Sequence, residues 1–387
     1  MNIKTSYTPL YFLSALGFGG LAVSFFMYLM FLTPHKTPVP TFETLVSYFQ
    51  VGNIFAKVMI VLALVGVIFF AFMHFKYLYH NFVHFNKYKL SPEYKELKTT
   101  NNEVLLMSLP TTLGMTINVL FILGALFVPG LWNVVEFLFP LSIFGFVLVG
   151  GFGLKILGEF YGRVVVKGDF SHDANNSFTQ LMSSFAFAMV GVGLAAPAAM
   201  SKLPVVAGVA MIFSIIFLVI AGILLMFNLI LSTNSIFKNG FSLQGGASVW
   251  IVIPIMTLIG IALVRLMHTI SHTFAGHIPN IFLLVLTSVI LSIQLFAGYY
   301  GYIILKKLDY FNKFVSGSEN NPGAYALICP GVGLFVFGFF FIDKGLIMNG
   351  LLDKFSILHF VLIGILMFVQ YKAIRTIFLL NKQLLHN

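Results

Sequence analysis

Ten long apolar stretches fill the chain almost from end to end, and short polar segments separate them. A stretch of roughly 20 apolar residues can lie in a bilayer only as a helix, because hydrocarbon offers no partner to free backbone groups. The pattern predicts an all-α integral membrane protein with a single transmembrane domain over residues 1–387. The expected spans are 9–32, 54–77, 105–129, 133–157, 177–199, 203–232, 249–268, 278–305, 323–342 and 354–380.

Polar and helix-breaking residues recur in every second span. Spans 3, 5, 7 and 9 begin near residues 105, 177, 249 and 323, at intervals of 72, 72 and 74 residues. Proline and glycine interrupt helical hydrogen bonds, which is tolerated in a membrane where protein or a water-filled path covers the freed groups. The recurring breakers are Pro110 with Gly114, Gly191 with Gly193, Pro254 with Gly260, and Pro330 with Gly331 and Gly333.

This alternation predicts five inner helices, odd-numbered and broken by proline or glycine, inside five outer helices. The unit would be a helical hairpin repeated with pseudo-five-fold symmetry around a central pore. Close packing through small residues accounts for many of the glycines without any pore, but it explains the matched prolines less well. Span 4 departs from the pattern of smooth even-numbered helices, because it contains Pro140 and the cluster Gly150-Gly151-x-Gly153.

Composition and charge narrow the class further. The chain is 59% hydrophobic and 9% charged, whereas a soluble domain has roughly 25% charged residues. Its net charge of +10 could indicate a nucleic-acid partner, but the basic residues lie in the loops between spans. Of the 22 lysines and arginines, 16 lie at the termini and in even-numbered loops and 6 in odd-numbered loops. This bias predicts cytoplasmic termini in the plasma (inner) membrane, with lipid and not nucleic acid as partner.

Residues 78–104 are expected to form a cytoplasmic basic linker. The segment Phe75–Tyr88 interleaves aromatic residues with lysines and histidines, which is typical of an anchor at the inner headgroup layer. A docking surface for a partner is the alternative.

Two histidine pairs offer a rival interpretation as a redox or metal protein. His80 with His84, and His268 with His272, each place two imidazoles on one helix face. The predicted topology puts the pairs on opposite sides of the membrane, so they cannot share one site. No nucleotide-binding loop of the Walker type occurs. We therefore expect no cofactor, no metal and no enzymatic activity. Because the chain has one cysteine, Cys329, it cannot form an internal disulfide.

Several of these segments resemble the tellurite-resistance/dicarboxylate (malate) transporter family, which includes bacterial TehA-type proteins and the slow anion channels of plant guard cells. Span 1 opens with Pro9 followed by Gly17, Gly19 and Gly20, similar to the family's proline-then-glycine opening. Ser108-Leu-Pro110-Thr111-Thr112 is close to a family pattern in span 3, and Pro330-Gly331-Val332 to one in span 9. The resemblance covers essentially all ten spans.

This resemblance implies a homotrimer in which each protomer has its own pore between the odd-numbered helices. The transported substrates would be small anions, such as inorganic anions, oxyanions or organic acids. Members of the family close the pore with a phenylalanine on span 9, and here that position falls on Cys329 or Pro330. The gate is then missing or supplied elsewhere, for which the candidates are Phe185, Phe187 and Phe335 besides Cys329.

Anion passage requires a favourable potential without a site that traps the ion. The expected pore-lining residues combine hydroxyls with the residues that break the inner helices. They are Ser108, Pro110, Thr112, Thr116, Ser184, Gly191, Pro254, Thr257, Pro330 and Gly331. Each hydroxyl has an alternative, which is to bond back to a carbonyl of its own helix. Arg265 is the expected charge at the outer mouth, or else it reaches the headgroups or pairs with Glu136.

The mechanism expected from these residues is channel-like. A proton-coupled carrier of dicarboxylates or weak acids is the alternative, and such carriers usually need a titratable residue inside the membrane. Glu136 and Glu159 lie near the ends of span 4, in the expected outer ring, which favours a channel.

Overall fold

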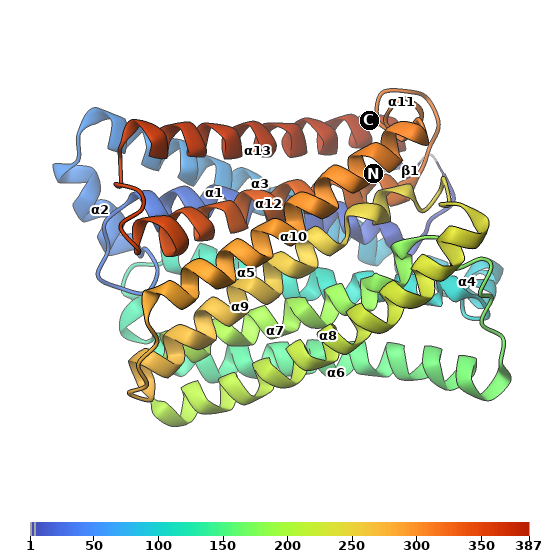
Figure 1. Ribbon diagram of the computed structural model, residues 1–387, viewed down its shortest axis with the longest axis horizontal. Coiled ribbons are helices and arrows are strands. Elements are labelled where there is room, and N and C mark those ends of the chain that lie inside the picture. The colour runs from blue at the N-terminus through green and yellow to red at the C-terminus, as the bar shows by residue number, and fades with distance from the viewer. Residues whose placement is uncertain (1, 4, 387) are drawn as a thin grey trace.

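The computed structural model in Figure 1 describes residues 2–3 and 5–386. Within these residues, ten helices are long and apolar enough to cross a membrane, as the sequence predicts. The strands β1 (Asn2–Ile3) and β2 (Leu385–His386) pair antiparallel and hold both termini at the same end of the bundle. We call this the terminal end, and the other the opposite end.

Each odd-numbered span starts at the terminal end with a 3-10 helix, which leads into an α-helix. These pairs are η1 (Pro9–Tyr11) with α1 (Phe12–Leu32), η2 (Asn101–Met107) with α5 (Ser108–Phe127), η4 (Phe178–Leu181) with α7 (Met182–Met200), η5 (Gly246–Trp250) with α9 (Val252–Thr273), and η6 (Pro322–Leu327) with α12 (Ile328–Phe340). A π-helix, η7 (Phe341–Ile347), continues α12 to the opposite end.

The even-numbered spans return to the terminal end as single α-helices. They are α3 (Ile54–Tyr88), α6 (Val135–Lys167), α8 (Pro204–Asn239), α10 (Asn280–Lys307) and α13 (Ile357–Leu384). Four short helices lie in the connections: α2 (Phe42–Val51), α4 (Pro92–Leu97), η3 (Leu131–Asn133) and α11 (Tyr310–Phe314).

The two sets of spans differ in burial. Between 50% and 94% of the apolar window of each odd-numbered span is buried, against 17% to 39% for the even-numbered spans. Contacts between helices follow the same division. The α-helices of the odd-numbered spans contact one another in a closed ring, in the order α1, α5, α7, α9, α12 and back to α1. Each of them also packs against the even-numbered span that follows it in the chain.

The 3-10 helices form a second closed ring at the terminal end. In this ring η1 contacts η2, and the order continues through η4, η5 and η6 back to η1. Tyr11 of η1 and Tyr325 of η6 are both fully buried there, with ring centroids 6.1 Å apart.

The structure corrects the predicted role of the matched prolines. Pro110, Pro254 and Pro330 are each the third residue of an α-helix that follows a 3-10 helix. Proline is tolerated in a first turn, because its missing N–H would have no intrahelical partner there. The prediction that these three prolines break helix interiors is therefore wrong. Within the described residues, interior prolines occur at Pro140 in α6 and Pro197 in α7.

The expected linker at 78–104 is also more regular than its composition indicates. Helix α3 continues unbroken through Tyr88, and α4 and η2 follow after short turns. Hydropathy identifies only the apolar part of a helix, whereas backbone hydrogen bonding continues through the polar residues that follow it.

Adjacent glycines in α6 provide a test of how this helix packs. A Cβ on Gly150 would come 2.2 Å from the ring of Phe217 in α8, whereas one on Gly151 would meet no atom within 4 Å. We expect Gly150→Ala to cost about 1–3 kcal/mol through overpacking, and Gly151→Ala to be neutral or slightly stabilising. Thermal unfolding of both variants in detergent measures the difference, and equal transition temperatures would contradict this packing.

Candidate functional site

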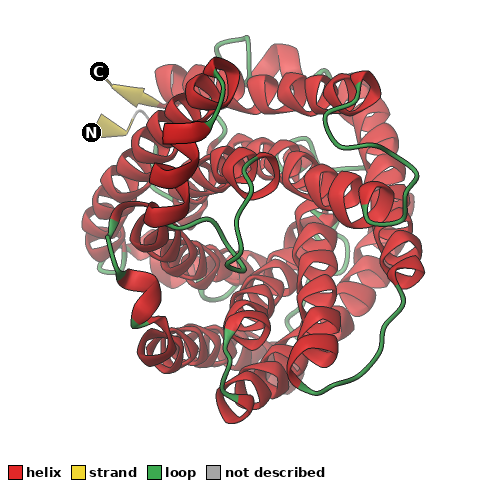
Figure 2. Cartoon of the chain, turned by 90° about the vertical axis from the view of Figure 1, so that its left-hand side faces the viewer, coloured by secondary structure: helices red, strands yellow, loops and turns green. Residues whose placement is uncertain are grey.

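A cavity of about 150 Å³ lies among the α-helices of the five odd-numbered spans, and α6 completes its wall. Figure 2 views the bundle along the spans from the opposite end. Most lining residues are apolar, and they include Met27, Phe146, Met189, Val336 and Phe340. We call this space the central cavity.

Helical periodicity explains which residues reach the cavity. In α12 the lining positions are Cys329, Val332, Gly333, Val336 and Phe340, and the same spacing places Pro254, Thr257, Leu258, Ile261 and Arg265 on the lining face of α9. Positions three or four apart lie on one face of an α-helix. Both helices therefore present one continuous face to the cavity.

A second cavity, of about 10 Å³, lies closer to the terminal end. Its lining includes Leu13, Met182 and Ala247, each close to the start of an odd-numbered span. Phe185, Pro254 and Cys329 line both cavities. These three residues form the wall between the two cavities, which we call the constriction.

Arg265 brings a positive charge to the central cavity. Its Nη1 donates to the backbone oxygen of Val192 in α7 at 3.0 Å. No carboxylate in the described part of the chain forms an ion pair with Arg265, so the alternative of a pair with Glu136 is not realised. Glu136 instead accepts hydrogen bonds from the Ser201 hydroxyl and the Lys202 backbone N–H, at 2.7 Å each.

The other polar side chains that line the cavity differ in how many of their hydrogen-bonding groups already have a partner. The Ser142 hydroxyl donates to Phe139 O at 3.0 Å, and the Thr257 hydroxyl donates to Ile253 O at 3.0 Å. Gln294 of α10 also donates to the Thr257 oxygen, at 2.7 Å. Asn118 of α5 makes one weak contact, from its amide nitrogen to the sulfur of Met189 at 3.6 Å. Among the neutral polar groups of the lining, the Asn118 amide thus has the most capacity for further hydrogen bonds.

Two of the ten expected pore-lining residues, Pro254 and Thr257, line the central cavity. The other hydroxyls are engaged with backbone carbonyls elsewhere. Ser108 donates to Pro9 O, Thr112 to Ser108 O, Thr116 to Thr112 O and Ser184 to Ala221 O. Gly191 faces Leu218 of α8, Gly331 faces Ala373 of α13, and Pro110 and Pro330 do not line the cavity. Sequence reasoning missed the lining methionines, which the spacing along the inner helices could have indicated. It also missed Phe146, which lies on α6, a span expected in the outer ring.

The four candidate gate residues fall into two groups. Phe185 and Cys329 lie at the constriction. Phe187 stacks on Phe217 of α8 with centroids 6.0 Å apart, and Phe335 packs edge-on against Tyr28 at 5.6 Å. Neither Phe187 nor Phe335 lines the cavity. A gating role for any of the four stays a prediction.

The histidine pairs lie near opposite ends of the bundle. His80 and His84 are on the part of α3 nearest the terminal end. His268 and His272 lie near the C-terminus of α9, at the opposite end of the bundle, and their rings stack with centroids 5.5 Å apart. Within the described residues, no three histidine, cysteine, aspartate or glutamate side chains form a group that could hold a metal ion.

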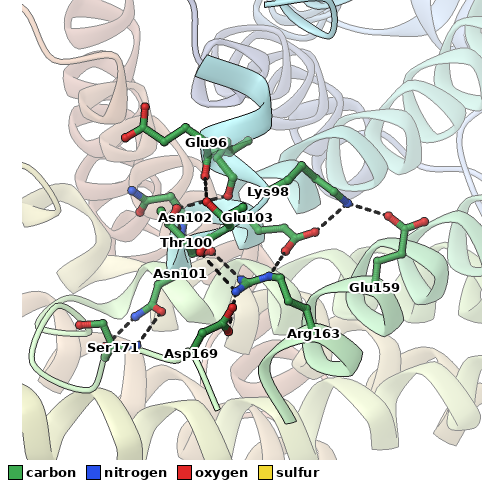
Figure 3. Close-up of polar contacts among 12 residues, drawn as sticks. Glu96, Lys98, Thr100, Asn101, Asn102, Glu103, Glu159, Arg163, Asp169 and Ser171 are labelled. Carbon is green, nitrogen blue, oxygen red and sulfur yellow. Dashed lines mark hydrogen bonds and ion pairs between the residues drawn. The ribbon is translucent and has the colours of Figure 1, made fainter. Parts of the chain in front are cut away.

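A buried carboxylate organises the terminal end near η2 (Figure 3). Glu103, 1% exposed, pairs with Lys98 at 2.7 Å and with Arg163 of α6 at 3.0 Å. Lys98 also reaches Glu159, and Arg163 reaches Asp169. Burial lowers the pKa of Lys98, but its hydrogen bonds to Glu103 and Glu159 raise the pKa above the usual lysine value. The raised pKa of Lys98 contributes to the free energy of unfolding. This contribution is fully present below the lysine pKa of the unfolded chain, about 10.4, and is lost as the pH rises through the pKa of Lys98 in the folded protein.

We expect Glu103→Gln to destabilise the protein by about 3 kcal/mol, because it leaves two cations at a buried site without their shared carboxylate. This cost is at the lower end of the range for breaking a buried ion pair, because Lys98 still pairs with Glu159 and Arg163 still pairs with Asp169. Glu159→Gln is the matched control. Its side chain is 49% exposed, so its loss should cost less than about 1 kcal/mol. Equal effects on thermal unfolding in detergent would contradict the buried role of Glu103.

The chain matches no protein-family model, and no curated protein matches it. The resemblance to the tellurite-resistance/malate transporter family therefore rests on the motifs quoted above.

Proposed function

We propose that this protein conducts small anions across the plasma (inner) membrane through a pore that contains the central cavity. The five odd-numbered spans would enclose the pore as repeated hairpin units, with the even-numbered spans outside. Arg265 is the observation that carries the proposal. Arg265 lies in a mostly apolar cavity, bonded to the Val192 carbonyl and without a carboxylate partner in the described residues, so its charge is available to attract an anion.

Helix direction adds to this argument. The N-termini of α1, α5, α7, α9 and α12 all lie toward the terminal end, where their 3-10 helices form a ring. The partial positive charge at a helix N-terminus favours anions. The positive-inside bias favours a cytoplasmic location for this end. An anion would then meet a favourable potential at the inner ring and again at Arg265.

On this proposal, the two separate cavities correspond to a closed state of the pore. Phe185, Pro254 and Cys329 separate the central cavity from a second cavity with room for about one water molecule. An apolar constriction of this kind gates by excluding water. Phe185 supplies the bulk that the family resemblance assigns to a phenylalanine on span 9.

A passive path fits the lining better than a proton-coupled carrier of dicarboxylates or weak acids. Among the lining residues described, the one ionisable group besides the Cys329 thiol is Arg265, and a guanidinium keeps its proton. Glu136 lies outside the cavity and is bonded to Ser201 and Lys202. The proposal includes a homotrimer with one pore in each protomer, which native mass measurement of the purified protein tests.

Anion flux into liposomes that contain the purified protein tests the function. Chloride, nitrate, sulfite and malate are compared with and without a pH gradient. Flux that follows the anion gradient alone supports the proposal, whereas flux that requires the pH gradient replaces it with a coupled carrier. Because a closed wild-type pore is part of the proposal, the Phe185→Ala variant is measured in parallel. Absence of flux in both proteins would contradict anion transport.

A further inference from the structure

The chemistry of the central cavity restricts the kind of anion that it can hold. Its lining residues include one permanent charge, Arg265, and walls built mainly from phenylalanine, methionine, valine, leucine and isoleucine. We propose that the cavity binds a small organic monoanion, with its acid group at Arg265 and its apolar part against these walls. This inference rests on the proposed function and names the substrate class.

The charge balance favours one negative charge over two. Arg265 can neutralise a single acid group, and in the part of the chain that the structure describes no lysine, histidine or second arginine lines the cavity. A second negative charge would lie in an apolar space without a counter-ion, which is strongly unfavourable. Dianions should therefore bind more weakly than monoanions of the same size.

Hydrogen-bonding capacity disfavours anions that are strongly hydrated. The Thr257 and Ser142 hydroxyls already donate to Ile253 O and Phe139 O. Within the described residues, the side-chain donors of the lining with remaining capacity are the other N–H groups of Arg265, the Asn118 amide and the weakly donating Cys329 thiol. This set can bind one acid group, whereas an inorganic oxyanion that is hydrated on all sides would lose water without replacement.

The size and the walls favour an apolar tail. An apolar cavity of about 150 Å³ in another protein accommodates benzene, so the central cavity has room for about six or seven heavy atoms. Each methylene moved from water onto apolar walls contributes about fourfold in affinity, the equivalent of about 0.8 kcal/mol. Apolar contact with Phe146, Met189 and Val336 would supply this gain.

Alkyl sulfonates are suitable probes, because they stay ionised at neutral pH and do not cross bilayers as neutral acids. Titration calorimetry on the purified full chain in detergent compares methanesulfonate, 1-propanesulfonate and 1,3-propanedisulfonate. We expect 1-propanesulfonate to bind about fifteenfold more tightly than methanesulfonate, because two more methylenes are buried. The disulfonate should bind at least tenfold more weakly than 1-propanesulfonate. Equal affinity for the mono- and disulfonate, or no dependence on chain length, would overturn the inference.

Variants of Arg265 connect the binding to this cavity. Arg265→Gln should weaken 1-propanesulfonate binding at least tenfold, whereas Arg265→Lys should retain part of the affinity and also controls for folding. Arg375 lies exposed on α13, outside the cavity, so Arg375→Gln is the matched control and should bind as the wild type does. Equal binding by Arg265→Gln and the wild type would overturn the inference.

Binding and transport can fail separately. Nitrate flux without 1-propanesulfonate binding would overturn the substrate class and leave anion transport in place. Binding that depends on Arg265, without flux of any anion in the wild type or in Phe185→Ala, would support the ligand site and overturn the transport function.

Discussion

Replacing Phe185 by alanine is expected to raise anion flux into liposomes at least tenfold. The ring of Phe185 forms part of the constriction, where Pro254 and Cys329 contribute less bulk. Without the ring the two cavities join, and the apolar segment that an ion must cross becomes shorter and wider. A barrier lowered by about 1.4 kcal/mol is enough for a tenfold increase in rate.

Phe187→Ala is the matched control for this experiment. Phe187 lies two residues further along α7, is 1% exposed and stacks on Phe217 instead of lining the cavity. Its loss should cost about 3–5 kcal/mol of stability through the space it leaves, with no increase in flux. If both variants raise flux equally, the leak comes from loosened packing and not from an opened constriction.

Replacing Arg265 by glutamine should lower anion flux by about tenfold to a hundredfold. A hydrogen bond to a charged group contributes about 1.5–3 kcal/mol, and losing it removes a comparable share of the attraction for a dehydrated anion. The variant is best measured in the Phe185→Ala background, where flux is high and the constriction does not limit the rate. Arg265→Lys keeps the charge and should retain a larger part of the flux.

The Arg375→Gln variant separates attraction at Arg265 from a general effect of surface charge. Arg375→Gln removes one positive charge from the exposed face of α13 and should leave flux unchanged at physiological ionic strength, because salt screens distant surface charges. Unchanged flux in Arg265→Gln would show that the guanidinium serves packing through its bond to Val192, and the proposed function would lose its main support.

Much of the fold could be predicted because hydropathy and loop charge are local properties of the chain. The ten spans, their order and the all-α class follow from the apolar stretches, and the structure contains all ten. The residues at which the helices begin and end were less predictable. Helix α3 extends eleven residues beyond the expected end at residue 77, to Tyr88, because a helix does not stop where its apolar part ends.

The candidate site was less predictable, because it depends on the face that each helix turns inward. The expected pore hydroxyls of Ser108, Thr112 and Ser184 bond to carbonyls away from the cavity. Residues that the sequence analysis did not single out, such as Met189 and Val336, line it instead. Thr257 lines the cavity, but its hydrogen bond to Ile253 O leaves it no free donor.

The sequence by itself determined that this protein is a ten-span helical membrane protein, since apolar length and charge distribution need no tertiary contacts to be interpreted. It also revealed the matched prolines. Only the tertiary structure decided that Pro110, Pro254 and Pro330 follow 3-10 helices in first turns. It alone placed Phe185 at the constriction and showed that no carboxylate among the described residues pairs with Arg265. These features depend on how helices distant in sequence pack together, and no local pattern encodes that packing.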